Sequence, residues 1–201
     1  MTLYKPKNSQ SKILKIKRSK FISYLRICES TQEFKSWLSQ IKRDHYDSSH
    51  VCWAYALHGE QSIDYYCSDG GEPSGTAGKP ILSRIKTNNL IQAGVIVVRY
   101  FGGTRLGKKG LIEAYRSAAD NVIGCGETIK WINTFKYSMT FPLRYYGEVH
   151  GYLSRLEVKI IKHTSNDYCK LVIEIGNSNK INLEQNLLDI TRGDCYMKKI
   201  D

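Results

Sequence analysis

The chain reads SDGGEPSGTAGKP at residues 68–80, GVIVVRYF at 94–101 and GGTRLGKKG at 102–110. Two glycine-rich loops therefore lie on either side of one apolar strand. Glycine is used where the backbone needs a positive φ or the close approach of another group, and each glycine costs entropy on folding. Two such loops beside one strand therefore predict a surface that the backbone shapes specifically.

The composition is that of a globular protein with a strong positive charge. Of 201 residues, 41% are hydrophobic and 24% are charged, and the net charge is +11. This hydrophobic share is enough for a buried core, and no apolar run approaches the roughly 18 residues that a membrane span needs. A basic surface attracts polyanions such as nucleic acid or ribosomes. We expect a cytoplasmic protein whose partner is RNA or the ribosome; a protein partner stays open, and no membrane is expected.

The cysteines and histidines give no sign of a metal site. The six cysteines are scattered without a Cys-x-x-Cys pair, and the five histidines form no helical His-x-x-x-His pair. His50 and Cys52 can meet on one face of a strand, but two ligands do not make a zinc site. We expect reduced thiols, no metal and no cofactor.

The first part of the chain predicts a domain of mixed helices and strands. Apolar periodicity and turn residues predict strands over 20–28, 51–57, 63–67 and 94–101, and helices over 30–41, 80–85 and 111–124. The lysine-rich opening segment before them predicts a frayed, solvated terminus, with an amphipathic arm as the alternative.

From about Lys130 the pattern of elements begins again. Strands over 135–141, 158–163, 168–175 and 195–200 and helices over 146–156 and 183–190 follow in the order βαββαβ. That order is typical of the ferredoxin-like split unit. The fold class is therefore α+β, with an N-terminal domain at 1–127 and a ferredoxin-like C-terminal domain at 128–201.

The second glycine loop nearly matches a phosphate-binding loop. Residues 102–108 fit Gly-x-x-x-x-Gly-Lys between a strand and a helix, but Lys109 stands where a magnesium-binding Ser or Thr belongs. We therefore expect no ATP or GTP hydrolysis. Backbone amides beside a helix N-terminus, together with Arg105, Lys108 and Lys109, still suit an anion. The alternative is a tight turn with solvated lysines.

The first glycine loop carries carboxylates and hydroxyls. An acid near a hydroxyl can indicate catalysis, but the loop has no Gly-x-Ser-x-Gly elbow and no clear histidine partner. Asp and Thr also stabilise turns by bonding nearby backbone amides. We therefore expect Asp69 and Thr76 to hold the loop, and Glu72 to combine a structural role with contact to a ligand.

These motifs resemble the signature of the IMPACT/YigZ family, in its bacterial two-domain form. The first motif is matched by Asp69, Glu72, Pro73, Gly75, Thr76, Ala77, Gly78 and Pro80. The second is matched by Arg99, Tyr100, Gly102, Gly103, Leu106, Gly107 and Gly110. The motifs cover roughly residues 18–124, and the layout extends the resemblance to both domains.

The resemblance implies a fold for each domain and a role connected with RNA or the ribosome. It implies a first domain like the second domain of a small-subunit ribosomal protein and like domain IV of elongation factor G, and a second domain like domain V of that factor. Both comparisons point to RNA or the ribosome, and eukaryotic relatives regulate translation by interfering with activation of an initiation-factor kinase.

The chain departs from the family pattern at two places. Gly70 stands where the family usually has a second Asp, so a role that needs adjacent carboxylates, such as metal binding, is in doubt here. Lys108 and Lys109 replace smaller residues, which strengthens the prediction of anion binding in this chain.

The function predicted from these observations is an RNA- or ribosome-associated regulator of translation without a catalytic residue. The predicted ligand- or RNA-binding residues are Asp69, Glu72, Thr76, Arg99, Tyr100, Arg105, Lys108 and Lys109. The alternative is a small hydrolase or phosphate-ester enzyme in the cleft between the two loops. A pocket in which Asp69, Glu72 and His50 converge would favour the enzyme.

Overall fold

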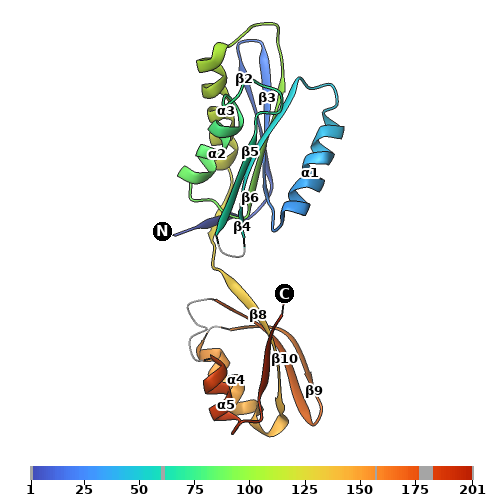
Figure 1. Cartoon of the computed structure of the whole chain (residues 1–201), viewed down its shortest axis with the longest axis vertical. Helices are drawn as coiled ribbons and strands as arrows, with labels where there is room; N and C mark the ends of the chain where they lie inside the picture. The colour runs from blue at the N-terminus through green and yellow to red at the C-terminus, as the bar shows by residue number, and fades with distance from the viewer. Residues whose placement is uncertain (1, 60–61, 157, 177–182, 201) are drawn as a thin grey trace. The chain divides into compact units, whose positions relative to one another are not determined.

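The computed structural model describes residues 2–59, 62–156, 158–176 and 183–200. It divides into two units, Met1–Trp131 (unit 1) and Ile132–Asp201 (unit 2), and each is taken by itself. Both units combine helices with antiparallel sheets, which confirms the α+β class (Figure 1). No helix in these ranges is long and apolar enough to cross a membrane.

Unit 1 is built on a five-stranded sheet with the strand order β2-β3-β6-β4-β5. Its elements, in chain order, are β1 (Tyr4–Pro6), β2 (Gln10–Ile16), β3 (Ser19–Ile27), α1 (Thr31–Asp44), β4 (His50–His58), β5 (Ile63–Ser68), α2 (Gly78–Thr87), β6 (Ala93–Tyr100), α3 (Gly107–Gly124) and β7 (Thr128–Lys130).

Helices cover both faces of this sheet, α2 and α3 on one and α1 on the other (Figure 1). The central strand β6 is therefore apolar on both faces, as its continuous hydrophobic run predicts. Val95 and Val97 pack in the core under α2 and α3, whereas Ile96 and Val98 pack in the core under α1. This alternation decides which face each functional side chain reaches.

The opening segment is ordered, and the prediction of a frayed terminus was wrong. Residues 4–6 form β1, which pairs with β7 so that Tyr4 lies opposite Lys130, and residues 10–16 form the edge strand β2 beside β3. Lys12 and Lys15 of β2 are both exposed, while Leu14 and Ile16 pack against the core. Lysine on an edge strand protects it from pairing with other chains.

A capping interaction begins α1 where the sequence predicts it. The Glu33 backbone N–H donates to Ser30 Oγ at 3.1 Å. Loss of such a cap costs about 1 kcal/mol. We expect Ser30→Ala to lower the free energy of unfolding by that amount, measured by urea denaturation. Ser39→Ala, in the same helix but away from its end, is the matched control, and equal effects of the two substitutions would contradict the capping role.

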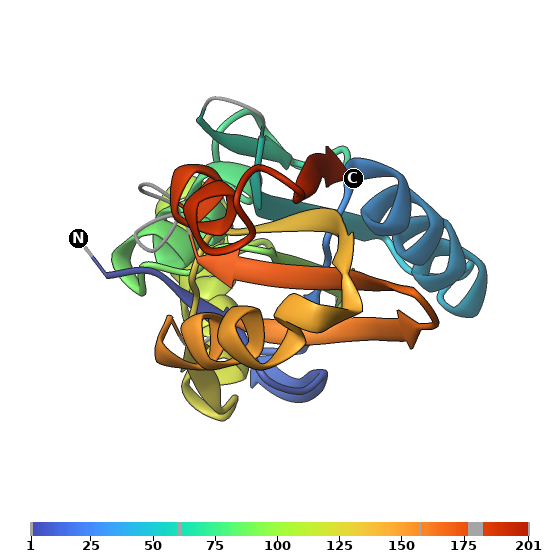
Figure 2. The same ribbon diagram turned by 90° about the horizontal axis from the view of Figure 1, so that it is seen from below.

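Unit 2 is a four-stranded antiparallel sheet with the order β11-β8-β10-β9, which can be followed in Figure 2. Its elements are β8 (Thr134–Pro142), a 3-10 turn (Leu143–Tyr145), α4 (Tyr146–Arg155), β9 (Lys159–Ser165), β10 (Tyr168–Gly176), α5 (Leu183–Ile190) and β11 (Tyr196–Ile200). Both helices lie on one side of the sheet (Figure 1), and Val149, Leu153 and Leu187 complete the core there.

Candidate functional site

The first glycine loop is held together by the carboxylate of Asp69. Its two oxygens accept hydrogen bonds from the backbone N–H groups of Gly75, Ala77 and Gly78, at 2.8 to 2.9 Å. Burial works to raise the pKa of Asp69, but these three donors and the nearby Lys79 outweigh it and hold the pKa below its ordinary value. Asp69 therefore organises the loop from inside.

In this chain the residue after this aspartate, Gly70, has a backbone conformation that leaves no room for a side chain. Its φ is +55°, and a Cβ at this position would collide with the backbone carbonyl of Val51. The next turn is fixed by Thr76, whose hydroxyl donates to the carbonyl of Pro73 at 2.7 Å. Glu72 lies between these two fixed points of the loop.

A buried ion pair joins this loop to the end of β6. Arg99 follows Val97 on the α2–α3 side of the sheet, and its Nη1 donates to Glu72 Oε1 at 2.6 Å. Both side chains are only 3–6% exposed. The Arg99 guanidinium also lies over the rings of Phe21 and Phe101, 5.6 and 5.3 Å from their centroids.

Three further groups surround the Glu72 carboxylate. Tyr115, from α3, donates its hydroxyl to Glu72 Oε1 at 2.9 Å, and His50 Nε2 lies 3.9 Å from Oε2. Burial, the neighbouring Cys52 and the Glu72 carboxylate raise the pKa of Tyr115, so its hydroxyl keeps its proton. Burial raises the pKa of the Cys52 thiol to about 12, so Cys52 is no nucleophile at neutral pH.

The second glycine loop places the N-terminus of α3 beside Glu72 and Arg99. Gly103 and Gly107 have φ of +83° and +70°. No side chain caps the first turn of α3, and that turn contains no acidic residue. The free N–H groups and the positive end of the helix dipole are therefore available to an anion.

These groups line one pocket of about 410 Å³, here called the glycine-loop pocket. Its lining consists of His50, Glu72, Pro73, Arg99, Phe101, Arg105, Leu106, Gly107, Lys108 and Leu111. Arg99 Nε, although buried, has no hydrogen-bond partner among the described residues. Because Glu72 is paired with Arg99, the rim cations Arg105 and Lys108 leave the pocket positive.

The structure brings four of the eight predicted residues to this pocket, namely Glu72, Arg99, Arg105 and Lys108. Asp69 and Thr76 lie inside the first loop, and Lys109 is exposed on α3 outside the pocket lining. Tyr100 lies on the α1 side, because consecutive strand residues face opposite ways. Its hydroxyl is 2.8 Å from His45 Nδ1 and donates to Asp47 at 3.2 Å.

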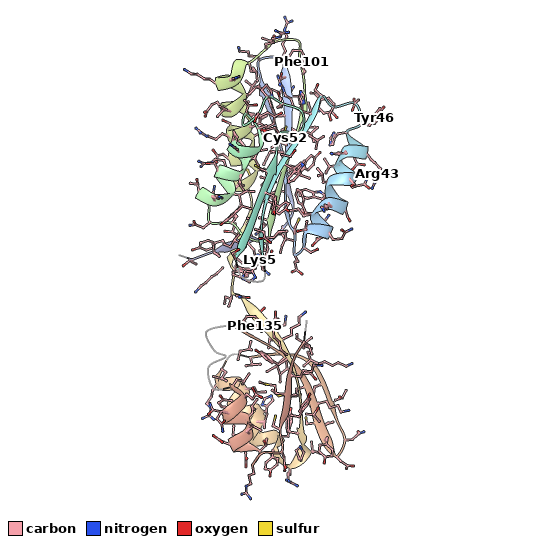
Figure 3. All side chains as sticks on the ribbon, viewed as in Figure 1. Lys5, Arg43, Tyr46, Cys52, Phe101 and Phe135 are labelled. Carbon is pink, nitrogen blue, oxygen red and sulfur yellow. The ribbon has the colours of Figure 1, made fainter. Side chains whose placement is uncertain are left out.

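Three further residues belong to the site although no sequence motif predicted them, namely Tyr115, Ser19 and Phe101. Tyr115 falls within the helix predicted over 111–124, yet a buried tyrosine hydroxyl needs a partner, and that need is the signal. Ser19 receives a 3.4 Å hydrogen bond from Arg99, and only the pairing of β3 with β6 brings the two together. Phe101, 48% exposed, directly follows the central strand β6, at the end of the sheet where it is labelled in Figure 3.

The donor set of the pocket does not resemble a metal centre. In the described ranges no three His, Cys, Asp or Glu side chains are grouped as metal ligands would be. Cations, backbone N–H groups and an aromatic ring instead suit an anionic ligand that carries a flat group.

Comparison with known proteins agrees with the motifs. The model of the Impact N-terminal domain matches residues 17–123. An IMPACT family member of Haemophilus influenzae is 40% identical over 110 residues, covering 54% of this chain and 53% of the relative. The chain thus spans about half the length of that relative.

Other matches extend over both units. The IMPACT family member YigZ of Escherichia coli is 26% identical over 187 residues, covering 92% of each chain. A solved structure, titled as the crystal structure of a hypothetical protein, superposes with a TM-score of 0.71 at 25% identity and covers 100% of this chain and 98% of its own. The chain belongs to the IMPACT family.

Proposed function

We propose that this chain is a cytoplasmic regulator of translation that acts by binding RNA, and that the glycine-loop pocket receives a backbone phosphate. The observation that carries the proposal is the pocket itself, where the uncapped N-terminus of α3 meets Arg99, Arg105 and Lys108. Helix N-termini and arginine side chains are the usual protein ligands of phosphate.

Arg99 supports the proposal of a bound ligand because it is buried; an arginine in an ion pair at the surface would not. Two of its nitrogens are used by Glu72 and Ser19, while its buried Nε is left without a partner in the described part of the chain. A buried unpaired donor is costly unless something satisfies it. A phosphate oxygen in the pocket would be a suitable acceptor, and the exposed ring of Phe101 at the rim could stack on the adjoining base.

The finer fold assignments belong to the same proposal. Unit 1 would correspond to the ribosomal-protein-like and elongation factor G domain IV-like domain, and unit 2 to the ferredoxin-like domain. The strand order β11-β8-β10-β9 with two helices on one face supports the second assignment. The relatives' shared name supports a role as a regulator at the level of the family.

Co-sedimentation with ribosomes tests the link to translation. We expect the native protein to pellet with ribosomes at low salt and Arg105→Ala/Lys108→Ala to remain largely in the supernatant, because both cations lie on the pocket rim. Lys35→Ala, an exposed lysine of α1, is the matched control and should pellet normally. A native protein that stays in the supernatant at every salt concentration would refute the proposal.

A small phosphate-ester enzyme remains the second candidate, and one observation favours it. His50 and Glu72 both line the pocket, 3.9 Å apart, as an acid–base pair would. Asp69 does not join them, because its carboxylate is bound to the backbone of its own loop. Turnover of a phosphate monoester that is lost in His50→Ala would favour this candidate.

A further inference from the structure

The sheet of unit 2 has one face without a helix. Because α4 and α5 both pack on the other side, the side chains that alternate away from the core remain uncovered (Figure 1). The pairing of the strands arranges these side chains in rows. Thr140 lies between Tyr196 and Lys170, and the next row places Ser138 between Lys198 and Val172. This surface is here called the open face.

The open face is strongly basic. Its lysines, all exposed, are Lys136, Lys159, Lys162, Lys170 and Lys198. Glu174 is the one acidic residue in the four strands, and it accepts a hydrogen bond from Thr134 at 2.7 Å. The acidic residues of the helices, Glu148, Glu184 and Asp189, lie on the opposite side of the sheet. The charge of this face therefore complements a polyanion.

Two exposed aromatic rings accompany the lysines. Tyr168 and Tyr196 are 57% and 69% exposed. Tyr168 is two residues from Lys170 on β10, about 7 Å along the strand, and Tyr196 is two strands from Lys170, about 10 Å across the sheet. Aromatic rings on a sheet, interleaved with cations, are how proteins stack the bases of single strands.

A hollow at one end of this face adds hydrogen-bonding groups. About 670 Å³ in volume, it is lined by Tyr168 and Lys170 together with Thr164, Ser165, Asn166 and Asp167 of the β9–β10 turn. The amide and carboxylate of the turn can bond base edges, while Lys170 can bond a phosphate. Duplex RNA offers no unpaired base to the rings, so this chemistry selects unpaired nucleotides.

We propose that the open face of unit 2 binds single-stranded RNA, with Tyr168 and Tyr196 stacking on bases and the surrounding lysines contacting phosphates. The inference rests on the proposed function in that the chain binds RNA, but it assigns a second surface and a preference for unpaired nucleotides. It involves no residue of the glycine-loop pocket.

The test measures the affinity of the full chain for a fluorescent single-stranded RNA 12-mer and for the same sequence as a duplex. Because stacking contributes about 1–3 kcal/mol per base, Tyr168→Ala and Tyr196→Ala should each weaken single-strand binding about 5- to 150-fold. Tyr168→Phe and Tyr196→Phe keep the ring and should bind almost as the native chain does. Tyr66→Ala, 58% exposed on β5, is the matched control and should change nothing.

The outcomes separate this inference from the proposed function. Alanine variants that bind the single strand like the native chain, with unchanged melting temperatures, would overturn the inference, and the proposed function would stand if Arg105→Ala/Lys108→Ala still weakened binding. Equal affinity for the duplex would also overturn it. A native chain that binds neither RNA would overturn both.

Discussion

We expect Arg99→Ala to lower the free energy of unfolding by about 3–5 kcal/mol, because it leaves the buried Glu72 carboxylate without its counter-charge. The carboxylate would keep the Tyr115 hydroxyl and the distant His50 ring as its neighbours. Arg99→Lys should recover only part of the loss, since an ammonium group cannot bond Glu72 and Ser19 as a planar guanidinium does. Urea denaturation measures each difference.

The control for this prediction is an ion pair of the same type in a more exposed place. Arg84 donates to Asp120 at 2.5 Å, but the two side chains are 26% and 39% exposed. Arg84→Ala should cost no more than about 1 kcal/mol. If Arg99→Ala cost as little as Arg84→Ala, the buried pair would not hold the first glycine loop to the end of β6.

Asp69→Ala should be the most damaging substitution after Arg99→Ala and should lower the free energy of unfolding by about 2–4 kcal/mol. Three backbone N–H groups would lose a charged acceptor, and each such bond is stronger than a neutral one. Asp69→Asn keeps one acceptor oxygen but no charge, so its stability should lie between that of the native chain and that of Asp69→Ala. RNA binding should weaken only in step with the loss of structure. Unchanged melting of Asp69→Ala with lost RNA binding would show instead that Asp69 contacts the ligand.

The lowered pKa of Asp69 adds a pH dependence with a definite sign. A carboxyl group whose folded pKa lies below its unfolded value contributes stability above the unfolded pKa, near the ordinary value of 3.8. That contribution is lost as the pH falls through the folded pKa. The gap in stability between the native chain and Asp69→Ala should therefore narrow below about pH 4.

Local patterns in the sequence predicted most elements of the fold. Ser30 marked the start of α1, the apolar run of β6 indicated a strand buried on both faces, and Pro80 indicated the short helix that the structure shows as α2. Each of these signals acts within a few residues along the chain. The opening strands were missed, because β2 is rich in lysine and the pairing of β1 with β7 joins Tyr4 to Lys130.

The candidate site was predicted only in part, because its sequence signals are also local. The loop motifs identified Glu72, Arg99 and the cations of the second loop, but not the groups that reach them from elsewhere. Tyr115 contacts Glu72 across 43 residues and Ser19 contacts Arg99 across 80, and such contacts depend on packing and strand register. Tyr100 was grouped with Arg99 because they are neighbours in sequence, although the strand turns them to opposite faces.

The most direct test of phosphate binding at the glycine-loop pocket is the salt dependence of RNA affinity, with the native chain compared with Arg105→Ala/Lys108→Ala. For a single strand, each neutralised phosphate contributes about −0.7 to the slope of log K against log salt. The account predicts a steep negative slope for the native chain and a slope shallower by about 1.4 for the double variant, with Lys35→Ala unchanged. Equal slopes for the native chain and the double variant, or an affinity indifferent to salt, would contradict it.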